Sequence, residues 1–273
     1  MLKLKLIYQD LLEMNVKKDN IINIEDNCDD FLVICDHSSN NIPETYNNLG
    51  VSRKDLNSHR AYDIGASDVA TELSKLLNCN LVMANFSRLL IDPNRGEDDP
   101  TLIPKLSEGK IIKGNLKISP SINDKERVKR IHQFYLPYHN QINKFITNSI
   151  NNGQVPKILS IHSFTPIWKG KQREIDVGIL WDKDDRLSKI FLNSLKKNKI
   201  GDNKPYSGRL KNDTLYKHAT SHGIPHVLIE IRQDLLKKGK DRLQWAKKIH
   251  NVLKDNDEII NSFSIKKYGS YCL

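Results

Sequence analysis

Short apolar runs along the chain alternate with segments in which apolar residues recur at helical spacing. The clearest run is Phe31–Cys35, an uninterrupted apolar stretch that is typical of a strand covered on both faces. Further runs predict strands, at 80–84, 85–95, 157–161, 175–181 and 226–231, the second of which ends in a loop broken by proline. Short, buried strands of this kind are typical of the central sheet of an α/β protein.

The segments between these strands have the period of amphipathic helices. In 67–77, Val69, Leu73 and Leu76 fall on one side. The same period predicts further helices, at 124–149, 184–197, 215–222 and 241–253, with a kink in the first at Pro137. Because strands that alternate with helices form βαβ units, we expect three α/β/α layers around a mixed, mainly parallel sheet.

Two segments lack a clear period. Residues 1–26 are polar, and we expect an N-terminal extension that packs on the domain. Residues 96–121 contain three prolines with many acidic residues and glycines, which predicts a long irregular segment. Such loops in compact domains often serve as lids or bind ligands. No linker composition divides the chain, so we expect residues 1–273 to form a single domain.

The composition is that of a globular protein. Hydrophobic residues make up 38% of the 273 residues, and no apolar run approaches the roughly 18 residues of a membrane-spanning helix. The N-terminus lacks the continuous apolar core of a signal peptide. Cys28, Cys35, Cys79 and Cys272 have no zinc-finger or redox spacing. We therefore expect a cytoplasmic protein with reduced thiols, of which Cys35 and Cys79 are buried.

The net charge of +10 raises the question of nucleic-acid binding, because clustered lysines and arginines are the electrostatic footprint of that class. The lysines are scattered, with short local runs at 196–199 and 237–240. Scattered charge is typical of a solvated surface, and it equally suits a small anionic substrate. We expect neither a nucleic-acid nor a membrane partner, and the sequence carries no signal for the oligomeric state.

Three predicted strands end in or near residues suited to metal chemistry. His37 and His162 each follow a buried strand, and Glu230 lies near the end of a third. The carboxyl ends of parallel strands meet at one edge of a sheet, where open α/β sheets bind ligands. Zinc hydrolases require imidazole and carboxylate ligands with one open position. From the residues alone, His37 could equally cap its loop and Glu230 could pair with a neighbouring arginine.

Five motifs surround these residues. They are Asp36-His37-Ser38-Ser39-Asn40-Asn41-Ile42-Pro43, His59-Arg60-Ala61-Tyr62-Asp63-Ile64-Gly65-Ala66, Ser87-Arg88-Leu89-Leu90-Ile91-Asp92-Pro93-Asn94-Arg95, Ser160-Ile161-His162-Ser163-Phe164-Thr165-Pro166 and Ile229-Glu230-Ile231-Arg232-Gln233-Asp234-Leu235. In this order, over about residues 31–253, they resemble the N-formylglutamate amidohydrolase family. The resemblance implies hydrolysis of linear amides and a fold similar to that of the zinc carboxypeptidases (phosphorylase/hydrolase-like).

The resemblance also implies roles for individual residues. His37 falls at the first zinc ligand of the carboxypeptidases and His162 at the last. Glu230 is similar to their catalytic glutamate. Asn94 and Arg95 are similar to the pair that holds the substrate carboxylate. The implied cofactor is Zn²⁺.

One position departs from the carboxypeptidase pattern. Those enzymes have a glutamate ligand three residues after the first histidine, whereas this chain has Asn40, whose neutral amide is a poor zinc ligand. Asp63 is our candidate for the third ligand. Asp36 is expected to orient a ligand from behind. The choice between Asp63 and Asn40 is open at this point.

The implied mechanism is metal-assisted hydrolysis of an N-acyl amino acid, such as N-formylglutamate. Glu230 would accept the proton of the attacking water and pass it to the leaving amine. Arg88 would stabilise the oxyanion. Arg95, with Asn94 and Arg232, would bind the substrate carboxylate, because a guanidinium offers two parallel donors.

Two other functions are compatible with these residues. The same site could act as a zinc exopeptidase on short or cell-wall peptides, or the chain could be a non-catalytic basic binding protein. His218, His222 and His226 lie near a helix that Gly223 and Pro225 interrupt, so we expect turn and surface roles for them, with contact of Tyr216 or His218 with the cleft as the alternative. No serine stands in the Gly-x-Ser-x-Gly turn of a serine hydrolase.

Overall fold

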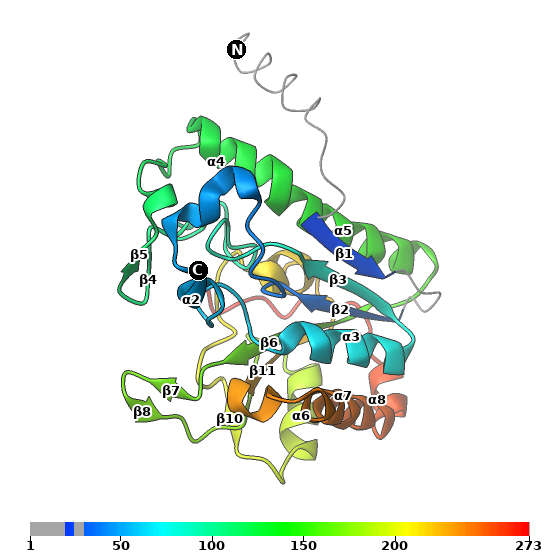
Figure 1. Ribbon diagram of the computed structural model, residues 1–273. Helices are drawn as coiled ribbons and strands as arrows, with labels where there is room; N and C mark the ends of the chain where they lie inside the picture. The colour runs from blue at the N-terminus through cyan, green and yellow to red at the C-terminus, as the bar shows by residue number, and fades with distance from the viewer. Residues whose placement is uncertain (1–19, 25–29, 273) are drawn as a thin grey trace.

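A seven-stranded sheet forms the centre of the molecule (Figure 1), in a computed structural model that describes residues 20–24 and 30–272. The strand order is β1-β3-β2-β6-β11-β9-β10. The strands are β1 (Ile21–Ile24), β2 (Phe31–Cys35), β3 (Asn80–Ala84), β6 (Lys157–Phe164), β9 (Val177–Leu180), β10 (Ile200–Asp202) and β11 (His226–Arg232). Apolar runs predicted β2, β3, β6, β9 and β11.

The sheet is mixed and mainly parallel, as predicted. Strands β3, β2, β6 and β11 run parallel to one another, and β10 runs parallel to β9. Strand β1 pairs antiparallel with β3, and β9 pairs antiparallel with β11. The carboxyl ends of the adjacent strands β2, β6 and β11 therefore lie at one edge. There, Glu230 on β11 is the register partner of His162 on β6.

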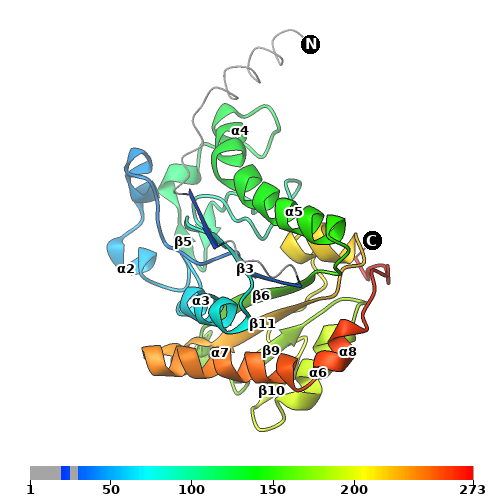
Figure 2. The same cartoon turned by 90° about the vertical axis from the view of Figure 1, so that its right-hand side faces the viewer.

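Helices cover both faces of the sheet (Figure 2), which confirms the three-layer architecture. The helices are α3 (Ala66–Leu77), α6 (Arg186–Ser194) and α7 (Gly239–Lys254) on one face, and α4 (Lys125–Arg130), η4 (Ile131–Tyr135) and α5 (Leu136–Asn151) on the other. Val33, Leu159 and Ile229 pack against the first set. Ile34, which follows Val33, and Leu228, which precedes Ile229, pack against the second set. This alternation is the period of a strand buried on both faces.

Shorter elements connect these layers. They are η2 (Glu44–Gly50), α2 (Arg53–Leu56), β4 (Leu106–Ser107), β5 (Lys110–Ile111), η3 (Lys113–Asn115), β7 (Ile167–Trp168), β8 (Lys171–Gln172), η5 (Tyr216–Thr220), η6 (Gln233–Leu236) and α8 (Asp257–Asn261). Among the described residues, no helix is long and apolar enough to cross a membrane. Cys35 and Cys79 are buried, as predicted, whereas Cys28 lies outside the described residues.

The helix predicted over 124–149 contains a π-helical turn, η4, between α4 and α5. Pro137 lies in the first turn of α5 and has no N–H to donate to the carbonyl of Gln133, four residues earlier. That carbonyl instead accepts a hydrogen bond from Asn20 Nδ2 at 3.0 Å. Of the predicted N-terminal extension, only residues 20–24 are described. Their strand β1 forms an edge of the sheet.

The predicted strand at 85–95 is wrong, although the segment is buried. Leu89, Leu90 and Ile91 are at most 1% exposed, yet they belong to turns rather than to the sheet. Ser87 Oγ donates to the carbonyl of Ala61 at 2.9 Å, so this segment contacts another loop instead of pairing with a strand. An apolar run indicates burial, but the segment becomes a strand only if its backbone pairs with another strand.

Two other predicted boundaries differ. Strand β6 was expected to end at Ile161 but continues to Phe164, because β11 pairs with it as far as Arg232. His162 therefore lies on the strand itself rather than in the following loop. The helix predicted over 215–222 is reduced to the π turn η5.

The long segment 96–121 is irregular, as predicted, and a buried amide anchors it. Asn115 Nδ2 donates to the carbonyls of Leu89 and Pro104, both at 2.8 Å. Asn115 Oδ1 accepts from Arg130 Nη1 at 2.7 Å, and the same Nη1 donates to the carbonyl of Leu90 at 2.9 Å. One side chain thus ties the long segment and α4 to the buried loop at 85–95.

We expect Asn115→Ala to lower the free energy of unfolding by about 2–4 kcal/mol, because it leaves two buried carbonyls and a buried guanidinium short of partners. Urea denaturation followed by circular dichroism measures the change. Asn123→Ala, at an exposed position, is the matched control and should change stability by less than about 0.5 kcal/mol. Equal effects of the two substitutions would contradict the anchoring role.

Candidate metal centre and substrate pocket

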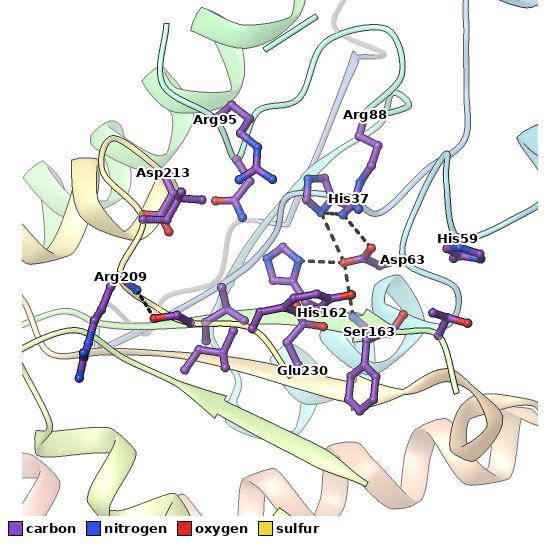
Figure 3. Close-up of a pocket in the computed structure, with 18 of the residues that line it drawn as sticks. His37, His59, Asp63, Arg88, Arg95, His162, Ser163, Arg209, Asp213 and Glu230 are labelled. Atoms are coloured by element: carbon purple, nitrogen blue, oxygen red, sulfur yellow. Dashed lines mark hydrogen bonds and ion pairs between the residues drawn. The ribbon is translucent and has the colours of Figure 1, made fainter. Parts of the chain in front are cut away.

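A cavity of about 480 Å³ opens at the carboxyl edge of β2, β6 and β11 (Figure 3). The predicted site residues that line it are His37, Asp63, Arg88, Asn94, Arg95, His162 and Glu230. They come from five segments of the chain that the sheet brings together. Arg232 is not among the described residues that line this cavity.

His37, directly after β2, presents its Nδ1 to the cavity. Its Nε2 lies 2.7 Å from Asp92 Oδ1, and the Nδ1 lies 3.4 Å from Asp63 Oδ2. Since a carboxylate oxygen accepts, the contact with Asp92 fits the tautomer of His37 that carries its proton on Nε2 and its lone pair on Nδ1. Carboxylates orient metal-binding histidines in this way.

His162, on β6, repeats this arrangement. Its Nε2 lies 3.0 Å from Asp36 Oδ2, and its Nδ1 lies 2.8 Å from Asp63 Oδ2. The rings of His162 and His37 meet edge to face, with their centroids 5.0 Å apart. Both imidazoles therefore direct Nδ1 to the same carboxylate.

Asp63 is held between the two histidines by its own backbone. Its N–H donates to the carbonyl of His37 at 2.9 Å, in the turn before α3. One ligand atom of each of His37, Asp63 and His162 lies within 4.8 Å of the others, and all three residues are buried. The structure thus brings the three predicted ligands together.

Asn40, the alternative third ligand, points elsewhere. Its Nδ2 donates to the carbonyl of Leu56 at 3.1 Å and to Asn57 Oδ1 at 2.9 Å. Among the described residues, it is neither in the cluster nor in the cavity wall. The geometry therefore favours Asp63.

Burial and hydrogen bonding oppose each other in this cluster. Burial alone would raise the pKa of Asp36, but the hydrogen bonds with His162 and Thr214 lower it below its usual value. Burial likewise opposes the charged form of His162, yet the carboxylates of Asp36 and Asp63 raise its pKa well above the usual range. Burial prevails at Asp63 and raises its pKa, despite the neighbouring His162.

Glu230 has a polar atom that no described group satisfies. Its Oε2 is buried and has no hydrogen-bond partner among the described residues. Burial raises the pKa of Glu230 to about 7, an effect that His162 reduces and Asp63 increases. A carboxyl group that titrates near neutral pH is suited to general acid and base chemistry.

Arg88 reaches into the cluster from the loop at 85–95. Its Nη2 lies 2.8 Å from Asp63 Oδ1 and also contacts Nδ1 of His37. The side chain places a positive charge beside the three candidate ligands.

Arg95 lies across the cavity from Ser163 (Figure 3), and Asn94 precedes it on the same loop. Asn94 Oδ1 accepts from the N–H of Thr214 at 3.1 Å, which leaves its Nδ2 for other acceptors. Arg95 Nε lies 3.9 Å from Asp92 Oδ2, a loose contact. The Arg95 side chain is 34% exposed and can reach a bound anion.

Arg232, the last residue of β11, binds the segment between β8 and β9. Its Nη1 donates to the carbonyls of Arg173, Glu174 and Ile175, at 3.1, 3.2 and 3.0 Å. Its Nε lies 2.7 Å from Asp234 Oδ1. These contacts use its donors within the protein, so they favour a structural role over the predicted contact with substrate.

Sequence reasoning assigned no role to Asp92 and Thr214. Asp92 orients His37, and Thr214 Oγ1 donates to Asp36 Oδ1 at 2.5 Å. Asp92 lies inside the quoted Asp-Pro-Asn-Arg motif, and its place after a buried apolar run was a signal that it needs a partner. Thr214 follows an irregular segment, and no sequence pattern marks it.

Two buried histidines support the loop that carries Arg95. His139 Nε2 lies 3.1 Å from the carbonyl of Pro93, and its Nδ1 lies 2.7 Å from His218 Nε2. Tyr135 Oη donates to the carbonyl of Arg95 at 2.7 Å. His218 and His226 are 3% and 2% exposed, so the surface roles expected for them are wrong.

The residues of the cluster fit a metal cation. Two imidazole nitrogens and a carboxylate oxygen converge, and such a donor set leaves room for water as a fourth ligand. Asp36, Asp63 and Glu230 bring several buried carboxylates to a place where Arg88 supplies a positive charge. A cation would offset this excess of negative charge. The unpartnered Oε2 of Glu230 lies beside the same cluster.

A mixed sheet with a His–Asp–His cluster and a buried glutamate at its carboxyl edge defines an α/β protein with a candidate metal site. The chain belongs to the N-formylglutamate amidohydrolase family, whose sequence model matches residues 29–237. This confirms the resemblance found in the sequence and makes the chain a member of a family that acts on amides.

Two solved structures are similar to this chain. A gene product from Agrobacterium tumefaciens is 33% identical, with a TM-score of 0.83 over 88% of this chain and 96% of that one. The N-formylglutamate amidohydrolase from Ralstonia eutropha JMP134 is 18% identical, with a TM-score of 0.60 over 87% of this chain and 99% of that one. The second likeness shows a shared fold. No curated protein matches the chain.

We expect the buried His218 to make the protein less stable in acid. Burial, with a smaller effect of Lys217, lowers the pKa of His218 to about 4. Between pH 4 and 6.5, His218 is therefore protonated in the unfolded chain but neutral in the folded chain. Stability therefore falls as pH drops through this window, by about 2 kcal/mol between pH 7.5 and pH 5.

Denaturation of wild type and His218→Gln at these two pH values tests this assignment. The variant should lose less stability than wild type between them, whatever its stability at pH 7.5. His222→Gln, at an exposed position, is the control and should keep the wild-type pH dependence. An identical loss in wild type and His218→Gln would rule out His218 as the source.

Proposed function

We propose that this protein is a zinc-dependent amidohydrolase that cleaves the amide bond of N-acyl amino acids, such as N-formylglutamate. The observation that carries the proposal is the convergence of His37, Asp63 and His162 within 4.8 Å, beside the buried, unpartnered Oε2 of Glu230. Membership of the family supports an amide substrate. The expected small anionic partner fits a cavity whose wall includes Arg88 and Arg95.

His37, Asp63 and His162 would hold the metal. We propose zinc, because imidazole and carboxylate ligands suit it and Asp36 and Asp92 orient the two imidazoles from behind. When bound, zinc polarises a carbonyl group and lowers the pKa of a water molecule.

Glu230 is the proposed general base. Its Oε2 is free to accept a proton from the attacking water, and a pKa of about 7 allows the carboxyl group to give that proton up again to the leaving amine. Arg88 is proposed to stabilise the negative charge that develops on the amide oxygen, because its guanidinium already lies beside Asp63.

Asn94 and Arg95 are proposed to bind the substrate carboxylate. The Asn94 Nδ2 and the partly exposed Arg95 guanidinium are donors on one loop, and a guanidinium matches a carboxylate with two parallel hydrogen bonds. We do not extend this role to Arg232, whose donors face backbone carbonyls. A cytoplasmic location and a single domain over 1–273 stay predictions.

Metal analysis tests the ligand set. We expect the purified protein to hold about one zinc ion per chain, and His37→Ala, Asp63→Ala and His162→Ala to lose most of it, because each removes one of three protein ligands. Inductively coupled plasma mass spectrometry after dialysis gives the metal content. Amide hydrolysis should fall with it, as it should on treatment of wild type with a chelator.

Asn40→Ala is the matched control, because its amide belongs to the same motif as His37 but faces Leu56. It should keep the zinc content of wild type. If Asn40→Ala loses zinc and Asp63→Ala retains it, the third metal ligand is Asn40 and not Asp63. Wild-type zinc content in both histidine variants would overturn the site.

Removal of the Glu230 carboxylate should separate metal binding from turnover. Glu230→Gln is expected to lower kcat for N-formyl-L-glutamate on the order of 10²–10⁴-fold while zinc content is unchanged. Steady-state release of formate measures turnover of N-formyl-L-glutamate. Release of amino acids measures cleavage of short peptides, which serve as parallel substrates. Faster cleavage of peptides than of N-formyl-L-glutamate would indicate an exopeptidase. Salt-dependent ligand binding that survives both this variant and chelation, without turnover, would indicate a non-catalytic binding protein.

A further inference from the structure

Arg173 lies against three aromatic rings, two of which line the cavity. Its guanidinium carbon is 5.3 Å from the ring centre of Phe164, 5.2 Å from that of Trp168 and 5.1 Å from that of Tyr206. Phe164 and Tyr206 line the cavity. Cation–π contacts with three rings hold the positive charge at this place without neutralising it.

Most donors of this guanidinium are unused. An arginine side chain has five N–H donors. Within 20–24 and 30–272, the side chain of Arg173 makes one hydrogen bond, from Nη1 to Tyr206 Oη at 3.1 Å, and no ion pair. By contrast, Arg88 is committed to Asp63. Arg173 thus offers a charged, largely unpaired fork to an incoming anion.

The backbone of Arg173 is fixed although its side chain is free to bind. Its N–H donates to the carbonyl of Pro166 at 2.8 Å, across the β7–β8 hairpin. Its carbonyl accepts from Arg232 Nη1 at 3.1 Å. Arg232 follows Glu230 by two residues on β11, so the same strand carries the proposed base and positions this arginine.

The charge of Arg173 also reaches the catalytic centre. Burial raises the pKa of Glu230, whereas the positive charges of Arg88 and Arg173 lower it. Its contacts with Phe164 and Tyr206, which both line the cavity, place Arg173 beside the pocket that holds Glu230. Phe164 follows Ser163 on β6, and Ser163 lies across the cavity from Arg95 (Figure 3).

We propose that Arg173 is a specificity-determining residue that binds the side-chain carboxylate of an N-acyl acidic amino acid, while Asn94 and Arg95 bind the α-carboxylate. The inference rests on the proposed amidohydrolase function and adds a second anion subsite to it. A cationic subsite at Arg173, together with one at Asn94 and Arg95, favours a substrate with two carboxylates over one with a single carboxylate.

The test compares N-formyl-L-glutamate with N-formyl-L-glutamine, which differ only in the charged group. For Arg173→Gln, kcat/KM for the glutamate substrate should fall on the order of 10- to 100-fold, mainly through KM. For the glutamine substrate it should change by less than about threefold. Arg173→Lys, which keeps the charge but loses the planar fork, should show a smaller fall on the glutamate substrate.

Lys171→Gln is the matched control, because it removes one positive charge from an exposed position on the same hairpin. It should leave the preference for glutamate unchanged, and thermal unfolding should show that all three variants are folded. Equal losses on both substrates in Arg173→Gln, or an equal change of preference in Lys171→Gln, would overturn the proposal.

Calorimetric binding to Glu230→Gln separates this inference from the proposed function. Glu230→Gln should bind N-formyl-L-glutamate more tightly than N-formyl-L-glutamine, and adding Arg173→Gln should abolish the difference. If wild type hydrolyses neither compound but this binding preference is present and depends on Arg173, the amidohydrolase proposal fails and the anion subsite stands. If Glu230→Gln binds both compounds equally, the subsite is overturned, whatever the turnover of wild type.

Discussion

The burial of carboxylates at the carboxyl edge of β2, β6 and β11 is the constraint on which this structure depends. A carboxylate removed from water costs several kcal/mol unless a partner satisfies it. Asp36 is 0% exposed and meets His162, Tyr138, Ser160 and Thr214. Its partners come from three parts of the chain, so the folded state has to assemble all of them around one charge.

This requirement explains features that lie outside the pocket itself. The loop at 85–95 is as buried as a strand but stays irregular, because Asp92 has to face His37 and a regular strand would pair its backbone instead. His139 and Tyr135, on the helices over the second face, hold the carbonyls of the same loop. The helical layer therefore supports the candidate ligands indirectly, through the loop that orients one of them.

The sequence alone predicted the sheet and its layers, because apolar runs report burial on both faces. It also brought His37, His162 and Glu230 to one edge. It could not distinguish Arg232 from a pocket residue, since alternation places Arg232 on the same side of β11 as Glu230. The direction of its long side chain depends on three carbonyls of another segment, at 173–175, and this contact forms only in the tertiary structure.

The same limit applies to the cations of the pocket, which a sequence presents as equivalent arginines. Arg88 is bound to Asp63 and His37, so it can stabilise charge beside the candidate metal ligands but cannot move to a distant carboxylate without abandoning them. Arg95 is loosely held, and Arg173 is held through aromatic rings rather than acidic groups. A guanidinium already paired with a carboxylate has less to gain from another, which is why we propose Arg95 and Arg173 for the recognition of substrate anions and Arg88 for the stabilisation of the reacting amide.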